Sequence, residues 1–511
     1  MAIAFGLWLG YTALIFGIFY FGYALKYYVS TIIALRLLEL KTPTNQLPFE
    51  SSDNKNSLYE PFISIHLPFY NEINVATRII NACRDIDYNN YEVLVADDSV
   101  DETVDILKSD EWRTGNPLIK LIHRGDRSGY KGGALRQATR HMHPDAEYVV
   151  VFDADFVPPP DILNQFLRHF RKQDDDKKPV AAVQGYQLHY LNKTENWLTK
   201  GVRAEFSGSY MVERVAAEAL GAMKMISGSV FMLRASVLRE LGWTTSITED
   251  WELTLRLYLE GYRVVYTPLI QAPAEIPNSV GRLIKQRMRW AEGHTFAVRK
   301  YFWRVVRSRM LTMAEKLEFL YFAPYYLQSL FLMVGTLFWA ASEMYRSRPI
   351  FWTPTLGWGL IISNFLAIPL MGLAGIFLEG DLREDFSGVF GFVALSYIVA
   401  PYQAYAALKG LLENEEGIWI RTLKTGNVTD SFFGIKFRIF MSWLRELRGS
   451  PQGIRHAETL GDMPVWVPVR GILMLLAFSL ILLPVLDYVN LQQLLSTISE
   501  RYFDCMKVVG V

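Results

Sequence analysis

The sequence predicts an α/β protein in which a doubly wound mixed sheet is joined to α-helices that cross or lie on a membrane. Two observations lead to this prediction. From Pro61 to about Tyr266, short apolar runs of strand character alternate with amphipathic stretches of helical character, a pattern typical of βαβ units. On both sides of that region lie long apolar stretches, and hydrophobic residues make up 51% of the chain. The mean hydropathy of +0.12 is high for a soluble protein.

The N-terminal stretch, residues 3–25, carries no charge and is long enough for a bilayer, which takes about 20 apolar residues. It lacks the basic start and short apolar core of a secretory signal. Lys26, Arg36 and Lys41 follow it. Because Lys and Arg mark the cytoplasmic side of a span, the next domain is expected in the cytoplasm.

The expected sheet domain contains five recognisable strands and three helices between them. The strands are FISIHL (62–67), YEVLVA (91–96), LIKLIH (118–123), YVVVF (148–152) and VAAVQG (180–185), and the helices are NVATRIINACR (74–84), VDETVDILKS (100–109) and GGALRQATRHM (132–142).

After the sheet domain the chain returns to the membrane. A basic amphipathic helix at 282–309 is expected in the interface, followed by apolar stretches at about 318–342, 355–379, 386–410 and 466–488. The segment between the last two stretches is expected in the cytoplasm because it carries Arg421, Lys424, Lys436, Arg438, Arg445 and Arg448. Three full spans between 318 and 410 would put it outside, so one of the three is expected to be interfacial or re-entrant.

The resulting division has seven parts. These are an N-terminal transmembrane helix (1–40), a cytosolic domain (41–280), interface helices (281–317), transmembrane helices (318–412), a cytosolic segment (413–464), a C-terminal transmembrane helix (465–490) and a tail (491–511).

Two aspartates follow the fourth expected strand directly. Asp153 and Asp155 come after YVVVF and before a run of three prolines, so they lie at the carboxyl end of a buried strand, where ligands bind in open α/β sheets. Carboxylates are hard oxygen ligands suited to Mg²⁺ or Mn²⁺ holding a diphosphate. A solvated turn is the alternative.

Other polar groups follow neighbouring strands. Tyr70 and Glu72 follow the first strand. Tyr70 would offer an aromatic face to a nucleobase and Glu72 a base or ribose contact, and the alternative is that Asn71 and Glu72 cap a helix. Asp97 and Asp98 end the second and can accept hydrogen bonds from a base or ribose. A glycine-rich loop after the third strand opens a helix with Lys131, which would face phosphate oxygens.

Three further motifs lie later in the chain: Ile226-Ser-Gly-Ser229, Thr248-Glu249-Asp250 and Gln286-Arg-Met-Arg-Trp290. Acidic residues are common at a helix N-terminus because of the helix dipole, and a basic aromatic helix beside a membrane is often an anchor. Taken singly, each motif therefore also has a structural explanation.

The order Tyr-Asn-Glu, Asp-Asp-Ser, Asp-x-Asp, Thr-Glu-Asp and Gln-x-x-Arg-Trp resembles the membrane-embedded family 2 glycosyltransferases of GT-A fold, related to cellulose, mannan, chitin and hyaluronan synthases. The resemblance covers about residues 61–300. The loop Gly129–Ala134 and Phe156 differ from bacterial cellulose synthases and are more similar to mannan and glucomannan synthases.

The resemblance implies a role for each matching residue. The implied donor-binding residues are Tyr70, Glu72, Asp97, Asp98, Lys131, Asp153, Gln286, Arg289 and Trp290, the metal ligands Asp155 and Asp153, the catalytic pair Asp250 (general base) and Glu249, the acceptor residues Trp290, Gly228 and Ser229, and the gating residues Thr422, Lys424 and Thr425.

We therefore predict an inverting, processive hexosyltransferase that uses a UDP- or GDP-sugar with Mg²⁺ or Mn²⁺, extends a β-linked glycan and passes it through the lipid bilayer. The alternative enzyme adds one sugar to a lipid acceptor. A transporter or scaffold with a degenerate domain is disfavoured because Asp153, Asp155 and Asp250 are intact. Lys and Arg (52) balance Asp and Glu (52), which argues against a nucleic-acid partner, and the two cysteines predict no disulfide framework.

Overall fold

The computed structural model of the protein describes residues 2–39, 60–109, 112, 118–171, 178–344, 358–380, 382–417, 419, 422 and 424–429. These residues form two compact units. One takes in Val29–Leu330 and the described residues from Pro369 onward, and the other takes in Met1–Tyr28 and Phe331–Ile368. The expected span at 466–488, most of the expected segment at 413–464 and the tail lie outside the described residues.

The larger unit is built on a mixed sheet of seven strands in the described residues, in the order β3-β2-β1-β4-β6-β5-β7. Strands β1 to β4 are mutually parallel, and β6 is antiparallel to β4 and β5. The strands are β1 (Phe62–Phe69), β2 (Tyr91–Asp97), β3 (Leu118–His123), β4 (Ala146–Val151), β5 (Val180–His189), β6 (Phe231–Arg234) and β7 (Arg263–Ala274). The five strands expected from the sequence are confirmed, and β6 and β7 were not anticipated.

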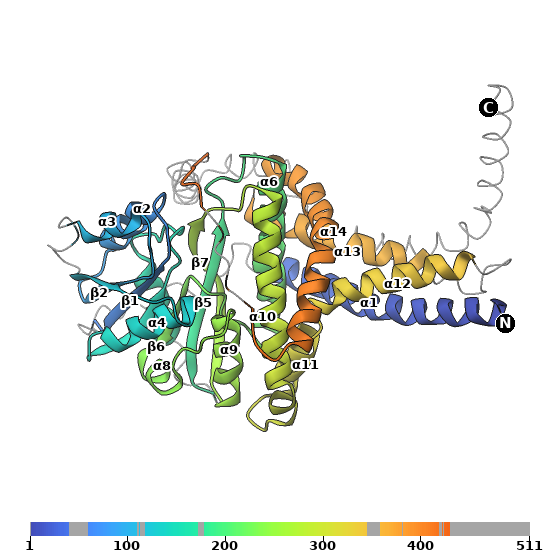
Figure 1. The fold of residues 1–511 in the computed structure, drawn as a ribbon, viewed down its shortest axis with the longest axis horizontal. Coiled ribbons are helices and arrows are strands. Elements are labelled where there is room, and N and C mark those ends of the chain that lie inside the picture. The colour runs from blue at the N-terminus through green and yellow to red at the C-terminus, as the bar shows by residue number, and fades with distance from the viewer. Residues whose placement is uncertain are drawn as a thin grey trace. The chain divides into compact units, whose positions relative to one another are not determined.

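Helices cover both faces of this sheet (Figure 1). Successive side chains of β2 point to opposite faces of the sheet. Val93 and Val95 pack toward α2, α3 and α5, whereas Leu94 and Ala96 pack toward α4, α8 and α9. The helices of the sheet are α2 (Ala76–Arg84), α3 (Thr103–Lys108), α4 (Tyr130–His141), α5 (Ile162–Arg171), α8 (Ala235–Leu241) and α9 (Glu249–Leu259).

A second group of helices packs beside β5 and β7. It comprises α6 (Trp197–Ser207), a π-helix (Gly208–Glu213), α7 (Arg214–Ala219), α10 (Val280–Arg307), α11 (Met313–Phe322) and α14 (Leu382–Leu412). Helix α14 lies along both α6 and α10 (Figure 1). Small residues permit the close approach, since a methyl group on Gly201 would come within 2.7 Å of the Gly391 backbone.

Buried charges fix the start of α14 to the sheet unit. The ammonium of Lys193, with none of its side chain exposed, lies 3.1 Å from the carboxylate of Asp385. The guanidinium of Arg203 is bonded to Glu379 and to the hydroxyl of Tyr186. Breaking such buried pairs from one side is strongly destabilising, so α14 is anchored to the sheet unit by more than apolar contact.

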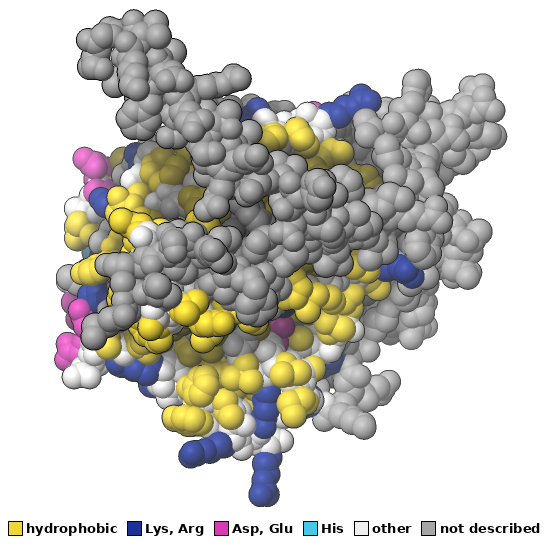
Figure 2. All heavy atoms as spheres, turned by 90° about the vertical axis from the view of Figure 1, so that its right-hand side faces the viewer, with side chains coloured by type: hydrophobic (Ala, Val, Ile, Leu, Met, Phe, Trp, Pro, Cys, Tyr) yellow, Lys and Arg dark blue, Asp and Glu magenta, His cyan; other side chains and the backbone are white. Residues whose placement is uncertain are grey.

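Apolar helices long enough to cross a membrane are present in the described residues. They are Ala4–Leu37 within α1 (Ala2–Glu39), Ile362–Glu379 within α13 (Trp358–Glu379), and α14, and a fourth is possible if α11 and α12 (Leu327–Met344), bent by 56°, form one span. Large hydrophobic side chains are exposed on α1 and α14, and hydrophobic side chains gather on the face shown in Figure 2.

Candidate active site

The candidate site lies where parallel strands end. The carboxyl ends of β1, β2 and β4 meet at one edge of the sheet, and the strand order changes direction between β1 and β4. Such a switch point is where open α/β sheets bind ligands. Residues from α4, from the turn before β6 and from the start of α9 complete the site.

Lys131 is the centre of this group of residues. Its ammonium lies 2.7 Å from Oδ1 of Asp153 and 3.2 Å from Oε1 of Glu249, and it donates to the carbonyl oxygen of Gly228 at 2.8 Å. Burial opposes its charge, but the surrounding carboxylates outweigh burial and raise the pKa of Lys131. Lys131 therefore stays a cation at the centre of the site.

Asp250 lies near Lys131, beside Gly228. A methyl group on Gly228 would be 3.2 Å from both Oδ2 of Asp250 and the ammonium of Lys131. Burial and the neighbouring Glu249 carboxylate raise the pKa of Asp250 from 3.8 to about 7. A carboxylate with a pKa near neutrality is suited to accept a proton from a hydroxyl group.

The turn between these groups is held in an unusual backbone conformation. Val230 has φ +56°, a value that β-branched residues rarely adopt. Its N–H donates to Val151 at the end of β4, and the Ser229 hydroxyl accepts from the N–H of Asp153. Strained backbone of this kind clusters at functional sites.

Asp155 has a different partner from Asp153. The ammonium of Lys424 lies 2.5 Å from Oδ2 of Asp155. Burial opposes ionisation of Asp155, but Lys424 outweighs it, so the pKa of Asp155 is lowered and the carboxylate stays charged. Glu275 accepts from the N–H groups of Thr425 and Gly426 beside it.

The Asp-x-Asp carboxylates fit a divalent metal ion in their chemistry. Oδ2 of Asp155 accepts a hydrogen bond from the Lys424 ammonium at 2.5 Å. Within the described ranges, no group of three or more His, Cys, Asp or Glu residues is arranged to hold a metal. A metal here would therefore depend on one or two carboxylates together with phosphate oxygens of a ligand, the usual arrangement for Mg²⁺.

An aromatic and cationic cluster lies next to β1 and β2. The guanidinium of Arg127 is 3.4 Å from the centroid of the Tyr70 ring and 4.8 Å from that of Trp419. Arg289 faces the same Trp419 ring at 5.0 Å. Asp98 is bonded to Arg124, and burial raises the pKa of Asp98. Flat aromatic and guanidinium faces of this kind can stack on a nucleobase.

The expected residues are thus brought together in three groups. Around Lys131 lie Asp153, Gly228, Ser229, Glu249, Asp250 and Arg289. Near Arg127 lie Tyr70 and Asp98, and near Glu275 lie Asp155, Lys424 and Thr425. Two other expected residues, Asp97 and Trp290, have different partners from these groups. Asp97 is fully buried and bonded to His123 and the Ser99 N–H. Trp290 packs against Arg287 and the core beside β5.

The remaining expected residues are Glu72, Gln286 and Thr422. Burial opposes the charge of Lys424, but Asp155, Glu275 and, to a smaller extent, Glu72 outweigh it and raise the pKa of that ammonium. Gln286 is partly exposed on α10. The Thr422 hydroxyl and the Arg289 Nε are buried without a partner in the described part of the chain, as expected for polar groups that await a ligand.

Sequence reasoning missed Arg127, Arg78 and Glu275. Arg127 lies in the glycine-rich loop, where only Lys131 was singled out. Glu275 directly follows β7, so the signal used for Asp97 and Asp153, an acid after an apolar strand, would have found it had that strand been recognised. Arg78 bonds both Glu275 and the backbone oxygen of Asp155, and no local pattern indicates that contact.

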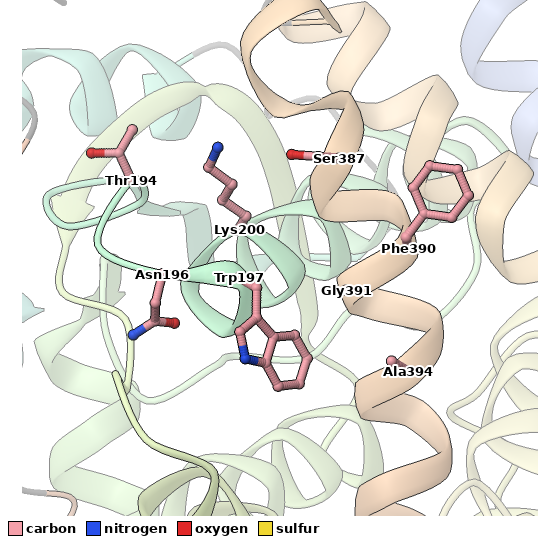
Figure 3. A pocket seen from close by; sticks show the side chains of 8 residues that line it. All are labelled: Thr194, Asn196, Trp197, Lys200, Ser387, Phe390, Gly391 and Ala394. Atoms are coloured by element: carbon pink, nitrogen blue, oxygen red, sulfur yellow. The ribbon is translucent and has the colours of Figure 1, made fainter.

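A separate cavity of about 550 Å³ lies between the start of α6 and α14 (Figure 3). Trp197, Lys200 and Phe390 are among its lining residues. None of the expected site residues lines it, so the expected chemistry is not located there.

Known proteins similar to this chain are glycosyltransferases. Residues 148–378 match the family model described as "Glycosyl transferase family group 2". A relative from Arabidopsis thaliana, glucomannan 4-beta-mannosyltransferase 7, is 31% identical over 272 residues, which are 51% of this chain and 48% of the relative. A probable glucomannan 4-beta-mannosyltransferase 7 from Oryza sativa subsp. japonica is 28% identical over 54% of this chain and 48% of its own length.

A solved structure has the same fold. The mannosyltransferase PcManGT from Pyrobaculum calidifontis, in complex with GDP-Man and Mn²⁺, superposes with a TM-score of 0.51 at 20% identity, covering 81% of this chain and 100% of that one. The sheet unit is therefore of the GT-A type. The chain spans about half the length of the curated relatives named above.

Proposed function

We propose that the chain, whose residues 148–378 match a family 2 glycosyltransferase model and which is similar to glucomannan 4-β-mannosyltransferases, builds a β-linked, mannan-type polysaccharide from a nucleotide sugar. The donor is a nucleoside diphosphate hexose, with GDP-mannose the first choice because the relatives are mannosyltransferases by name. The observation that carries the proposal is the meeting of Lys131, Asp153, Glu249 and Asp250 at the ends of the central strands.

The reaction is a single displacement. The acceptor hydroxyl oxygen forms the new bond to the anomeric carbon, its proton passes to the Asp250 carboxylate, and the bond to the diphosphate oxygen breaks with its electron pair. Lys131 and Arg289 stabilise the negative charge on the leaving nucleoside diphosphate. Because no covalent enzyme intermediate forms, the anomeric configuration inverts. Bound Mg²⁺ or Mn²⁺ would be held by Asp155, with Asp153, and would supply further charge stabilisation.

The remaining residues position the donor. Tyr70, with Arg127 and Trp419, forms the aromatic and cationic surface on which the base stacks. Asp97, Asp98 and Glu72 would contact the nucleoside. Gln286 and Trp290 of α10 would bind the donor, and Trp290 would also border the acceptor. Gly228, which is close to both Lys131 and Asp250, and Ser229 after it would border the space for the acceptor hydroxyl.

The proposed membrane arrangement follows from chain connectivity and from the contacts of α14. We propose that α14 lies at the membrane surface against the catalytic domain, which keeps the segment after it on the same side as Asp155. Its contacts with α6 and α10 and the Lys193–Asp385 pair support this. Trp197 and Phe390, 52% and 67% exposed, line the adjoining cavity with Lys200 (Figure 3), a combination typical of the lipid–water interface.

The experiment that tests the function uses the full chain in detergent. It is incubated with Mn²⁺ or Mg²⁺ and, separately, with GDP-mannose, GDP-glucose, UDP-glucose and UDP-N-acetylglucosamine, and nucleotide release, product size and anomeric configuration are scored. We expect high-mass β-linked product from one donor, lost in Asp250→Asn and kept in the exposed control Asp145→Asn. A lipid-soluble product carrying a single sugar would refute processive synthesis, and no turnover with any donor would refute the proposal.

A further inference from the structure

Two glutamines of β5 hold the backbone of the turn that precedes β6. The side-chain oxygen of Gln184 accepts from the Ser227 N–H at 2.8 Å, and its nitrogen donates to the Ser229 carbonyl oxygen at 3.0 Å. The side-chain nitrogen of Gln187 donates to the carbonyl oxygens of Ser227 and, at 2.9 Å, of Ser229. Gln184 is fully buried and Gln187 is 7% exposed. The two side chains therefore bind the turn at both of these serines.

A bulge in β5 brings both side chains to the same turn. In a regular strand, residues three positions apart point to opposite faces of the sheet. The register of β5 against β7 shifts between Gln184 and Tyr186, and such an irregularity re-aims the neighbouring side chains. Gly185 lies in the shift, where a Cβ would be 2.6 Å from the carbonyl oxygen of Ile270. Glycine at this position therefore permits the bulge that directs two amides to one turn.

The turn is bonded in its other direction to charged groups of the candidate site. The Gly228 carbonyl oxygen accepts from the Lys131 ammonium at 2.8 Å, and the Ser229 hydroxyl accepts from the Asp153 N–H at 3.0 Å. Gly228 and Val230 have φ of +76° and +56°. Such backbone persists only where the surrounding structure holds it in place. The two glutamine amides, bonded on both sides of Gly228, are contacts of this kind.

We propose that Gln184 and Gln187 are positioning residues for glycosyl transfer and act through the turn on Lys131. By holding the Gly228 carbonyl oxygen in place, they fix the Lys131 ammonium at the point where the leaving diphosphate gains negative charge. A neutral amide suits this task, because it binds the backbone with its donor and its acceptor and adds no charge beside Lys131. This inference rests on the proposed function and deepens it.

The test uses Gln187, because replacing the fully buried Gln184 would also disturb the core of the sheet. Gln187→Met keeps the size of the side chain and removes its donors. For the full chain in detergent, kcat and the donor KM are measured with Mn²⁺ and the donor that the wild type uses, and Tm is measured in parallel. We expect kcat to fall about tenfold, since two hydrogen bonds are lost. The donor KM should stay within about twofold of the wild-type value, because Lys131 acts mainly in the transition state.

Two further variants separate positioning from packing. Gln187→Glu keeps the shape of the side chain but places a carboxylate against two carbonyl oxygens, so its kcat should fall further than that of Gln187→Met. Gln271→Met is the matched control, because Gln271 lies on the neighbouring strand β7 and donates to the Pro268 carbonyl oxygen at 2.9 Å. Its kcat should equal that of the wild type. A loss of Tm that both methionine variants share measures packing alone.

Hydrogen exchange at the Ser227 and Val230 amides reports on the turn itself and should be faster in Gln187→Met. A wild-type kcat in Gln187→Met would overturn the inference, whether or not exchange at the turn changes, and would leave the proposed function standing. A raised donor KM with kcat unchanged would also overturn it, because Gln187 would then serve donor binding. So would a fall in kcat that disappears when activity is referred to the folded fraction. No turnover by the wild type with any donor would overturn the proposed function and the inference with it.

Discussion

Asp250→Asn should remove glycosyl transfer and at the same time stabilise the protein at alkaline pH. Burial and Glu249 raise the pKa of Asp250 from 3.8 to about 7, so the folded protein retains a proton that the unfolded chain has released between these values. The folded state therefore loses stability as pH rises through this window, and the loss is complete above pH 7. Asparagine cannot ionise and escapes this loss.

The magnitude follows from the two pKa values. The raised pKa of Asp250 lowers the free energy of unfolding of the wild type by about 4 kcal/mol at pH 8 and by about 1.5 kcal/mol at pH 5. The loss is therefore about 2.5 kcal/mol larger at pH 8 than at pH 5. Because the Asp250 side chain is partly exposed, solvent screening reduces this figure, and we expect about 1 kcal/mol. The gain in Tm of Asp250→Asn over the wild type should then be larger at pH 8 than at pH 5 by a few degrees.

The assay is thermal unfolding of both proteins in detergent at pH 5, 6.5 and 8, with transfer activity measured in parallel. Activity of the wild type should rise with pH through about 7 because the base must be ionised. Asp155→Asn is the matched control. Burial opposes the charge of Asp155, but Lys424 outweighs it and lowers the pKa of Asp155, so the charged carboxylate stabilises the folded state and its loss should destabilise the protein at pH 8. An Asp250→Asn gain that is the same at pH 5 and pH 8, or a loss at pH 8, would refute the reasoning.

Three further predictions concern the rest of the site. Lys131→Met should lower the free energy of unfolding by about 3 kcal/mol, measured by denaturation, because the buried Glu249 carboxylate and the partly exposed Asp153 carboxylate lose their shared cation. Gly132→Ala should cost about 1–3 kcal/mol or more, also measured by denaturation, because its Cβ would lie 2.2 Å from the carbonyl oxygen of Thr244. Arg127→Ala should raise the donor KM about fivefold with kcat unchanged, because its stacking on Tyr70, worth about 1 kcal/mol, acts in the ground and transition states alike.

Each of these substitutions has a control of the same type. Lys285→Met removes an exposed lysine, Arg140→Ala removes an exposed arginine at the end of α4, and Gly125→Ala adds a methyl group where no atom lies within 4 Å. A control that behaves like its partner variant would contradict the local explanation. A fall in kcat for Arg127→Ala, with KM unchanged, would show that Arg127 acts on the transition state instead.

The sheet was predictable because its signals are local. Buried parallel strands need continuous apolar runs, and these runs end where polar turn residues begin, so Asp97, Asp153 and their strands were found together. Strand β6 was missed because Phe231–Arg234 has only four residues, too short to show a period. Strand β7 was missed because Pro268 and Pro273 interrupt its apolar pattern.

The sequence by itself determined the fold class, the membrane-length apolar helices and the positions of the acidic motifs, since each depends on neighbours in the chain. Tertiary structure alone decided which charges meet. Asp153 and Asp155 are two residues apart, yet one is paired with a lysine of α4 and the other with a lysine from beyond α14. Electrostatic pairing and burial depend on distance in space, and they set the pKa of Asp250. For that reason the state of each carboxylate could be assigned only once the chain was folded.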